Sequence, residues 1–455
     1  MSYTPSEDEL RQIYVGKDIT DVAKPCAVLD AAIIRRNCAK MIHAVKALDI
    51  GFRAHVKTHK TTQITKLQMG STEETFDVNL VVSTVNEIHH LVPLLKEFRA
   101  NDRRVNVLYG IPLVPSQVPR LARLAQELGE DTITLMLDHP DQIEFLRQFR
   151  ALAGFPACVF VKVDTGYHRA GLPPTGLNKD GLLKRLAQAE RDGHARLLGV
   201  YSHSSLSYGG SSPEEAMGYL AAEIEGCRDA VRHHVELLPE RELVISVGAT
   251  PQAASVRNLL QGQGEMSAEA QALGELLREL LRNPLPGARV KVELHAGNYA
   301  VLDMQQVETN AEIRGSPEDE VALSVVAEVC SLYNSGERAQ PEALLAAGTL
   351  ALGREPCHSY PGWGVVGQWR REAAQSRLIL ARISQEHSIL SWETEGDGIS
   401  HIPLKVGQAV RVYPNHSCVT GAMYGWYLVV DSDLDDKSKV VDVWTRARGY
   451  SALPA

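Results

Sequence analysis

The sequence has little of what marks several specialised classes of protein. Its seven cysteines are an odd number and include no CxxC pair, which is typical of reduced thiols in a cytosol-like environment. Lys and Arg number 47 against 56 Asp and Glu, for a formal net charge of −9. Nucleic acid is held by an excess of basic residues, so we expect no nucleic-acid partner.

Long apolar runs are also missing. The longest strongly apolar stretch, around Ala343 to Leu352, is far shorter than the roughly 20 residues that a membrane helix requires. The first residues, MSYTPSEDELRQIY, are polar and acidic, unlike a signal or transit peptide. We therefore expect no membrane association and a cytoplasmic location.

The chain has an ordinary globular composition, with 44% hydrophobic and 23% charged residues. Short apolar or β-branched runs alternate with longer amphipathic stretches, a pattern that predicts parallel strands joined by helices. Eight strands are expected, at 52–56, 80–83, 106–109, 132–137, 158–163, 197–201, 243–247 and 290–294. Eight strands favour an α/β fold with a TIM-like (β/α)₈ barrel, and a doubly wound open sheet is the alternative.

Beyond about Asn298 the helical periodicity gives way to strand-like segments separated by Gly, Pro and Asp turns. These segments are 321–330, 377–383, 409–413, 426–430 and 440–445. The sequence thus predicts a barrel over residues 25–300 and a second, β-rich domain formed by residues 1–24 and 301–455.

Several predicted barrel strands end in residues that can carry chemistry. Lys57 follows the first strand, Asp164 and Arg169 follow the fifth, and Tyr201 and His203 end the sixth. The carboxyl ends of barrel strands form the face on which barrel enzymes build their sites. Taken singly, each residue could equally be an exposed surface group or a helix cap.

Two further loops are expected at the same rim. After the seventh strand, Ser246-Val-Gly248-Ala249-Thr250-Pro251 leads into a helix, and such small residues let backbone N–H groups approach a phosphate. The same sequence is also compatible with a simple turn. The eighth strand is followed by His295-Ala-Gly297-Asn298-Tyr299, another compact loop.

In the β-rich domain, His416 and Cys418 are two residues apart. On an extended strand they would face the same side and share one metal ion. Imidazole and thiolate favour zinc, although a bare pair of this kind can also arise by coincidence. A site with two protein ligands would keep open positions, which suits catalysis rather than a structural role.

Considered together, these motifs closely resemble those of the eukaryotic-type D-serine dehydratases that depend on zinc and pyridoxal 5'-phosphate (PLP). The matching segments are His55-Val-Lys57-Thr-His-Lys60-Thr, Val161-Lys-Val-Asp164-Thr-Gly-Tyr-His-Arg169-Ala-Gly171, Tyr201 with Tyr208, the Gly248 loop, Gly297-Asn298-Tyr299 and Asn415-His416-Ser-Cys418. Order and spacing agree over nearly the whole chain. The group also contains D-threonine aldolases and D-threo-3-hydroxyaspartate dehydratases, and belongs to the alanine-racemase-like fold-type III PLP enzymes.

The resemblance implies a role for each matching residue. Lys57 corresponds to the lysine that forms the Schiff base with PLP and then acts as the general base. Arg169, Tyr201 and His203 are similar to residues that orient and stack on the cofactor ring. Phosphate contacts are implied for Tyr208, Gly248, Ala249, Thr250, Gly297 and Asn298, and zinc ligands for His416 and Cys418.

The implied reaction is β-elimination of D-serine to pyruvate and ammonia, with zinc as the Lewis acid on the leaving hydroxyl. A thiolate at Cys418 argues for zinc and dehydration, whereas the aldolases use Mg²⁺ or Mn²⁺, which a carboxylate suits. The Glu386-His387 pair could still supply the base that an aldolase requires. A D-threonine aldolase, a D-threo-3-hydroxyaspartate dehydratase and, more distantly, a non-catalytic PLP-binding protein remain alternatives. The resemblance also implies a homodimer.

Overall fold

The computed structural model describes residues 5–70, 76–260, 266–282, 289–312, 315–368, 376–394 and 401–449. These residues form two compact units. The barrel unit consists chiefly of Ala39–Gly297, and the sheet unit takes in the described residues of Met1–Cys38, Asn298–Glu308 and Arg314–Arg448.

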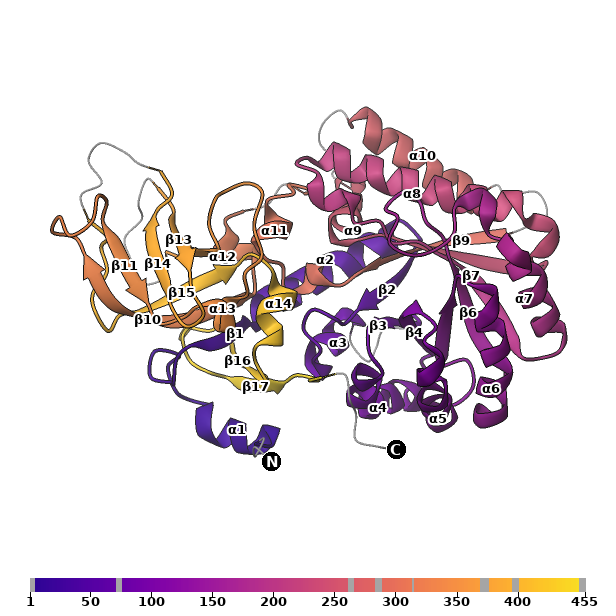
Figure 1. The fold of residues 1–455 in the computed structure, drawn as a ribbon, viewed down its shortest axis with the longest axis horizontal. Helices are drawn as coiled ribbons and strands as arrows, with labels where there is room; N and C mark the ends of the chain where they lie inside the picture. Colours follow the sequence, from indigo (N-terminus) through magenta and orange to yellow (C-terminus); the bar gives the residue numbers. More distant parts are fainter. Residues whose placement is uncertain are drawn as a thin grey trace. The chain divides into compact units, whose positions relative to one another are not determined.

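The barrel unit is built on eight parallel strands that close on themselves, because β9 pairs with β2 (Figure 1). The expected (β/α)₈ barrel is confirmed, and the open sheet is not formed. All eight expected strands are present. Their bounds are β2 Gly51–His55, β3 Val78–Val82, β4 Val105–Pro112, β5 Ile133–Leu137, β6 Ala157–Lys162, β7 Ala195–Tyr201, β8 Glu242–Val247 and β9 Arg289–Ala296.

Amphipathic helices surround these strands (Figure 1). In α5, for example, Leu121, Leu124 and Leu128 are buried, and the helix ends at Gly129, whose φ of 97° most residues cannot adopt. The helices are α2 Ala31–Ala47, α3 Thr62–Gln68, α4 Val85–Ala100, α5 Val118–Leu128, α6 Glu144–Ala153, α7 Leu182–Arg191, α8 Pro213–His233, α9 Thr250–Ser255 and α10 Ala268–Arg282.

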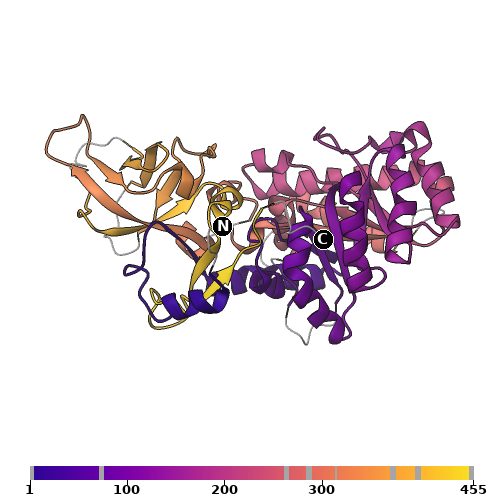
Figure 2. The same cartoon turned by 60° about the horizontal axis from the view of Figure 1, so that its bottom comes forward.

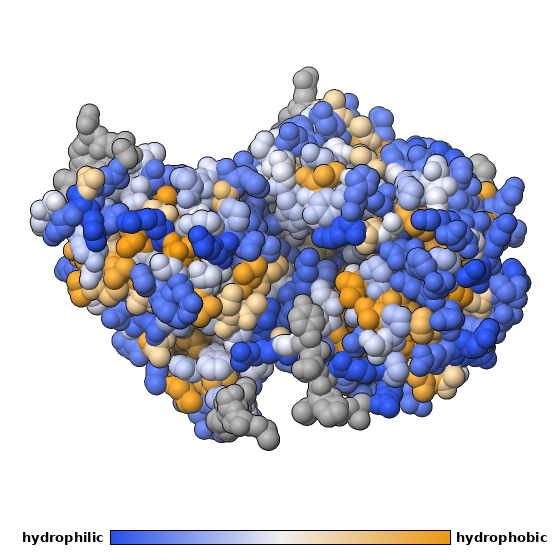
Figure 3. Space-filling model, in the orientation of Figure 1, coloured by the Kyte–Doolittle hydropathy of each residue, from blue (hydrophilic) through white to orange (hydrophobic). Residues whose placement is uncertain are grey.

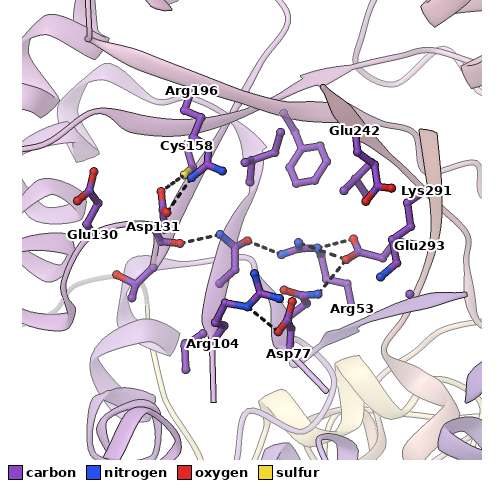
Figure 4. A pocket seen from close by; sticks show the side chains of 18 of the residues that line it. Arg53, Asp77, Arg104, Glu130, Asp131, Cys158, Arg196, Glu242, Lys291 and Glu293 are labelled. Carbon is purple, nitrogen blue, oxygen red and sulfur yellow. Dashed lines mark hydrogen bonds and ion pairs between the residues drawn. The ribbon is translucent and has the colours of Figure 1, made fainter. Parts of the chain in front are cut away.

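The barrel interior is filled by side chains, with a cluster of Val81, Leu108, Met136, Phe160 and Tyr201. At the amino ends of the strands lies a cavity of about 650 Å³ lined mainly by charged and polar groups (Figure 4). Its inner wall contains the buried Arg53–Glu293 ion pair, with 2.7 Å between Nε and Oε1. Charged residues at this end of a barrel generally serve stability rather than catalysis.

The sheet unit is dominated by one nine-stranded sheet, in the order β11-β14-β13-β12-β15-β10-β1-β16-β17. Figure 2 shows the strands of this unit from a second direction. Because β11 also pairs with β10, the six strands β10 to β15 form a closed ring of pairings. Their bounds are β1 Cys26–Asp30, β10 Leu323–Tyr333, β11 Glu342–Leu345, β12 Gly364–Val366, β13 Leu378–Ile383, β14 Ser388–Trp392, β15 Ala409–Pro414, β16 Trp426–Val430 and β17 Asp442–Thr445.

Strand β1 departs from the expected division of the chain. It falls within the expected barrel range 25–300, yet it pairs antiparallel with β10 and parallel with β16 in the sheet. The chain enters the barrel unit only within α2, after Cys38. The expected β-rich character of the later residues is confirmed, while the domain boundaries stay a prediction.

Short helices complete the sheet unit: α1 Glu7–Tyr14, α11 Met304–Val307, α12 Pro317–Glu320, α13 Thr349–Leu352 and α14 Ser417–Ala422. The face shown in Figure 3 is mostly hydrophilic, with apolar residues in small groups. Among the described residues, no helix is both long and apolar enough to cross a membrane.

Candidate active site

The sequence-predicted residues of the barrel unit come together at one rim. Lys57 follows β2, Tyr201 ends β7 and leads to His203, and Gly248 follows β8. The strands are parallel, so their carboxyl ends open on the same face of the barrel. The charged cavity of Figure 4 lies at the opposite ends of these strands.

The loop that carries Lys57 is fixed by a backbone hydrogen bond and by an ion pair. The Lys60 N–H donates to the Val56 carbonyl at 2.9 Å, closing a turn around Lys57, and the Lys60 amine pairs with buried Glu87 at 2.9 Å. Among the described residues, the Lys57 amine has no hydrogen bond or ion pair, and its side chain is partly exposed. This amine is therefore available to a ligand in the barrel mouth.

Three rings stack beside this lysine. The Tyr201 and His295 rings are nearly parallel, and the His295 and His203 centroids are 5.4 Å apart. His203 Nδ1 lies 2.7 Å from the Gly248 carbonyl, which can only accept, so Nδ1 carries the proton. It follows that neutral His203 presents an unprotonated Nε2.

Burial lowers the pKa of His55, His203 and His295 well below the usual range, and neighbouring cationic groups add to this effect. All three imidazoles are therefore neutral at pH 7. Burial also lowers the pKa of Lys162, at the end of β6, to about 8. With Lys57 nearby, the mouth carries positive charge, which favours an anionic ligand.

The loop after β8 turns sharply into α9. Gly248 has φ of 129°, and a Cβ there would lie 2.7 Å from the His295 carbonyl oxygen, so only glycine fits. Ala249 is the N-cap of α9 and supplies no capping hydrogen bond. The first-turn N–H groups, including that of Thr250, thus lack a side-chain cap, as in many anion-binding helices.

The remaining predicted cofactor contacts differ in their surroundings. Arg169 is exposed, with its guanidinium 5.0 Å from the centre of the Tyr167 ring. Tyr208 lies in a short helical turn, Leu206–Gly209, and is partly buried. Gly297 packs tightly on His55, whereas Asn298 belongs to the sheet unit, where its amide donates to Asp303.

In the sheet unit, His416 and Cys418 are hydrogen-bonded to each other. The two residues do not share the face of an extended strand, because β15 ends at Pro414 and His416 is the N-cap of α14. The bend into α14 brings the two side chains together. Burial opposes protonation of His416, but Cys418, Asp303 and Glu355 together raise its pKa to about 9.

Buried hydrogen bonds fix this segment. The Ser417 N–H donates to the Asp303 carboxylate at 2.8 Å, and the Asn415 amide donates to the carbonyls of Glu355 and Gly362 at 3.0 and 2.8 Å. These bonds fix Asn415, which precedes His416, and Ser417, which lies between the two candidate ligands.

Comparison with known proteins assigns the family. The chain is 34% identical over 452 residues to D-serine dehydratase of Schizosaccharomyces pombe. The aligned region covers 98% of this chain and 96% of that protein. Residues 322–430 match the family "Putative serine dehydratase domain", and residues 29–261 match "Alanine racemase, N-terminal domain". The chain belongs to the D-serine dehydratase family.

Two further comparisons agree with membership of this family. D-serine dehydratase of Saccharomyces cerevisiae is 29% identical over 454 residues, covering 95% of this chain and 97% of that protein. The solved structure of D-threo-3-hydroxyaspartate dehydratase from Delftia sp. HT23 superposes with a TM-score of 0.71 at 25% identity, covering 95% of this chain and all of the other. D-serine dehydratases are PLP-dependent lyases with an alanine-racemase-like barrel.

The residues at the carboxyl-end rim of the barrel in this D-serine dehydratase family protein fit PLP. Lys57 offers an unpaired amine and α9 an uncapped first turn. Two fully buried polar atoms nearby in the sequence, Ser207 Oγ and Gln252 Oε1, have no hydrogen-bond partner among the described residues. A ligand with an aldehyde, a ring and a phosphate would use groups of this kind.

His416 and Cys418 fit a catalytic zinc ion in part. They provide one imidazole and one thiol in mutual contact, the donor types that zinc prefers. Within the described ranges, no group of three or more His, Cys, Asp or Glu side chains is arranged to hold a metal.

The proposed aldolase base, Glu386 with His387, lies exposed in the turn between β13 and β14. Sequence reasoning did not assign roles to three buried groups of the barrel mouth: Lys162, Glu223 and His295. Glu223 could have been noticed, because it interrupts the apolar face of α8 formed by Leu220, Ile224 and Cys227.

Proposed function

We propose that the protein is a D-serine dehydratase that uses PLP and zinc to convert D-serine into pyruvate and ammonia. The observation that carries this proposal is the full-length similarity to the D-serine dehydratase of Schizosaccharomyces pombe. The amine of Lys57, which has no hydrogen bond or ion pair among the described residues, supports it, and so does the contact between His416 and Cys418.

Lys57 is the catalytic base in this proposal. When bound, PLP would supply an electron sink for the negative charge left at Cα of the amino acid. Lys57 Nζ takes the Cα proton, and the turn closed by Val56 and Lys60 holds that nitrogen in place. Arg169, Tyr201 and His203 orient the ring of the cofactor in this proposal. His203 presents an unprotonated Nε2.

The phosphate side is assigned to Tyr208, the Gly248-Ala249-Thr250 turn, Gly297 and Asn298. Among these, the Thr250 N–H begins α9, which has no side-chain cap, so it can donate to a phosphate. The cationic side chain of Lys162 adds attraction for an anion.

His416 and Cys418 hold the metal in this proposal. When bound, zinc would supply a Lewis acid for the hydroxide that leaves Cβ, which is a poor leaving group at neutral pH. Asp303 and the Asn415 amide keep the ligand-bearing segment fixed. Loss of water from D-serine leaves an enamine, and its hydrolysis gives pyruvate and ammonia.

The proposal is tested by initial rates with PLP and zinc present on D-serine, L-serine, D-threonine and D-threo-3-hydroxyaspartate. Pyruvate release that is fastest from D-serine is the expected result. Absence of pyruvate from D-serine, with either other D-substrate consumed, would overturn the substrate assignment and retain the enzyme class.

D-threo-3-hydroxyaspartate dehydration is the second candidate, favoured by the structural similarity to the Delftia enzyme. Both dehydrations need the same base and leaving-group acid, and the substrates differ by a carboxylate on Cβ. Oxaloacetate formation from D-threo-3-hydroxyaspartate at a higher kcat/KM than pyruvate formation from D-serine would support this candidate. A D-threonine aldolase would instead release glycine and acetaldehyde.

We also propose a homodimer in the cytoplasm. The dimer rests on resemblance to fold-type III enzymes, in which partner subunits complete each site. Seven free cysteines suit a reducing compartment. Light scattering that gives twice the chain mass of 49.9 kDa is expected, and a monomer would contradict the dimer.

A further inference from the structure

Glu223 is a buried carboxylate on the inner face of α8. It is 1% exposed and interrupts the apolar face formed by Leu220, Ile224 and Cys227. A carboxylate in such a place is unfavourable unless hydrogen bonds replace its lost hydration. Its partners therefore indicate why the fold tolerates it.

Each carboxylate oxygen of Glu223 accepts two hydrogen bonds. Oε1 accepts from the Ser202 hydroxyl at 2.8 Å and the Ser204 N–H at 2.7 Å. Oε2 accepts from the Gly248 N–H at 3.2 Å and the Gln252 amide at 3.0 Å. Burial raises the pKa of Glu223, and the four donors on its two oxygens oppose that effect because they stabilise the ionised carboxylate.

These four donors belong to two separate segments of the rim. Ser202 and Ser204 flank His203 after β7, whereas Gly248 follows β8 and Gln252 lies in the first turn of α9. One side chain thus ties the loop assigned to the cofactor ring to the loop assigned to its phosphate. His203 Nδ1 adds a direct link by its hydrogen bond to the Gly248 carbonyl.

The bond to Gly248 also selects which N–H groups remain for a phosphate. The Gly248 N–H is committed to Glu223 and is therefore not available to a phosphate. Without the carboxylate, Gly248 N–H and Ser204 N–H would both lose their buried acceptor, and the two loops would lose their common anchor.

From this arrangement we infer that Glu223 is a positioning residue for the cofactor: it sets the spacing between His203 and the Ala249-Thr250 turn. The inference rests on the proposed function, since it assigns PLP to this rim. It assigns no contact between Glu223 and the cofactor. The carboxylate acts through the two loops alone.

The test is a spectrophotometric PLP titration of the cofactor-free full-length protein, with parent and Glu223→Gln compared. A glutamine cannot accept from all four donors, so the Kd for PLP is expected to rise about tenfold or more. The visible absorption band of bound PLP is expected to shift, because His203 loses its fixed place. Neither change depends on measuring turnover.

Leu146→Ala is the matched control, because Leu146 is fully buried in α6 outside the strands and away from both loops. It should lower the thermal unfolding midpoint by creating a cavity and leave the Kd for PLP within about twofold of the parent. If Glu223→Gln and Leu146→Ala lose similar thermal stability but only Glu223→Gln has a raised Kd for PLP, the effect is due to positioning and not to general destabilisation.

If the parent binds PLP and Glu223→Gln binds it equally well, with the same absorption band, the role of Glu223 is overturned and the proposed function stands. If the parent binds no PLP, both fall together. Should Glu223→Gln fail to fold, Ser202→Ala removes a single donor to the same carboxylate. An unchanged Kd in that variant likewise overturns the inference, and a rise of about threefold supports it.

Discussion

The rings of Tyr201 and His295 are stacked, with centroids 4.2 Å apart and planes at 6°. The amine of Lys162 lies 5.0 Å from the centre of the same Tyr201 ring. The Tyr201 side chain is therefore packed between polar groups in the barrel mouth, and the residue is only 3% exposed. The cost of burying Lys162 beside it leads to a prediction about pH.

Lys162 should make stability rise with pH above neutrality. Burial lowers its pKa from 10.5 to about 8 in the folded protein, whereas the unfolded chain keeps the ordinary value. Between about pH 8 and 10.5 the unfolded chain binds more protons, so the free energy of unfolding increases with pH. The shift corresponds to roughly 3 kcal/mol.

Urea unfolding of cofactor-free parent and Lys162→Met at pH 7, 8.5 and 10 checks this. The parent should gain stability relative to Lys162→Met across the series. Lys162→Arg is the control, since arginine stays charged and should show no such gain. A parent-to-methionine difference that stays flat with pH would show that Lys162 has an ordinary pKa.

Lys57 should be the residue that PLP modifies. Borohydride reduction of the PLP-loaded protein followed by peptide mass spectrometry should place the cofactor mass on Lys57. Lys57→Ala should lose turnover by about 10²- to 10⁴-fold or more, because it removes the base. Lys66→Ala, an exposed lysine of α3 paired with Glu97, should behave as the parent. Cofactor mass on Lys162 instead would refute the assignment.

The thiol of Cys418 should decide which metal is used. Replacing soft sulfur by a carboxylate in Cys418→Asp should weaken zinc binding in a chelator competition and favour Mn²⁺ or Mg²⁺. His416→Ala should weaken zinc binding as well. The exposed Cys330 provides the control Cys330→Ala, for which parent-like zinc affinity is expected. Equal zinc affinity in Cys418→Asp would remove this cysteine from the metal site.

The ion pair Arg53–Glu293, at the end of the barrel opposite the rim, should matter for stability (Figure 4). Both side chains are nearly inaccessible, and Glu293 also accepts from Asn79 and Ser246. Glu293→Ala leaves Arg53 buried without its partner and should lower the free energy of unfolding by about 3–5 kcal/mol. The double variant Arg53→Met with Glu293→Leu should lose less, and an equal loss in both would contradict this account.

Much of the barrel was predictable because its pattern is local. Each strand, such as Cys158 to Val163, is a short apolar run between amphipathic helices, and both faces of a barrel strand are buried. Lys57 and the Gly248 turn were predictable because they follow such strands directly. Their grouping at one rim follows from the parallel direction of the strands.

Other features depend on contacts far apart in the sequence. Cys26–Asp30 is as apolar as a barrel strand, and only its pairing with Leu323–Tyr333 places it in the sheet. The short strands β11, β12 and β14 carry too few residues for a clear pattern. His416 and Cys418 were identified as a pair, but the bend at Asn415 that joins them is fixed by distant Glu355 and Gly362.

Pyruvate release from D-serine by the PLP-loaded protein, before EDTA treatment, after it, and after zinc is restored, tests the account most directly. We predict rapid release that EDTA abolishes and zinc restores, with no release from L-serine. Release that persists undiminished after EDTA would contradict the role given to His416 and Cys418, and no release under any of these conditions would contradict the proposed function itself.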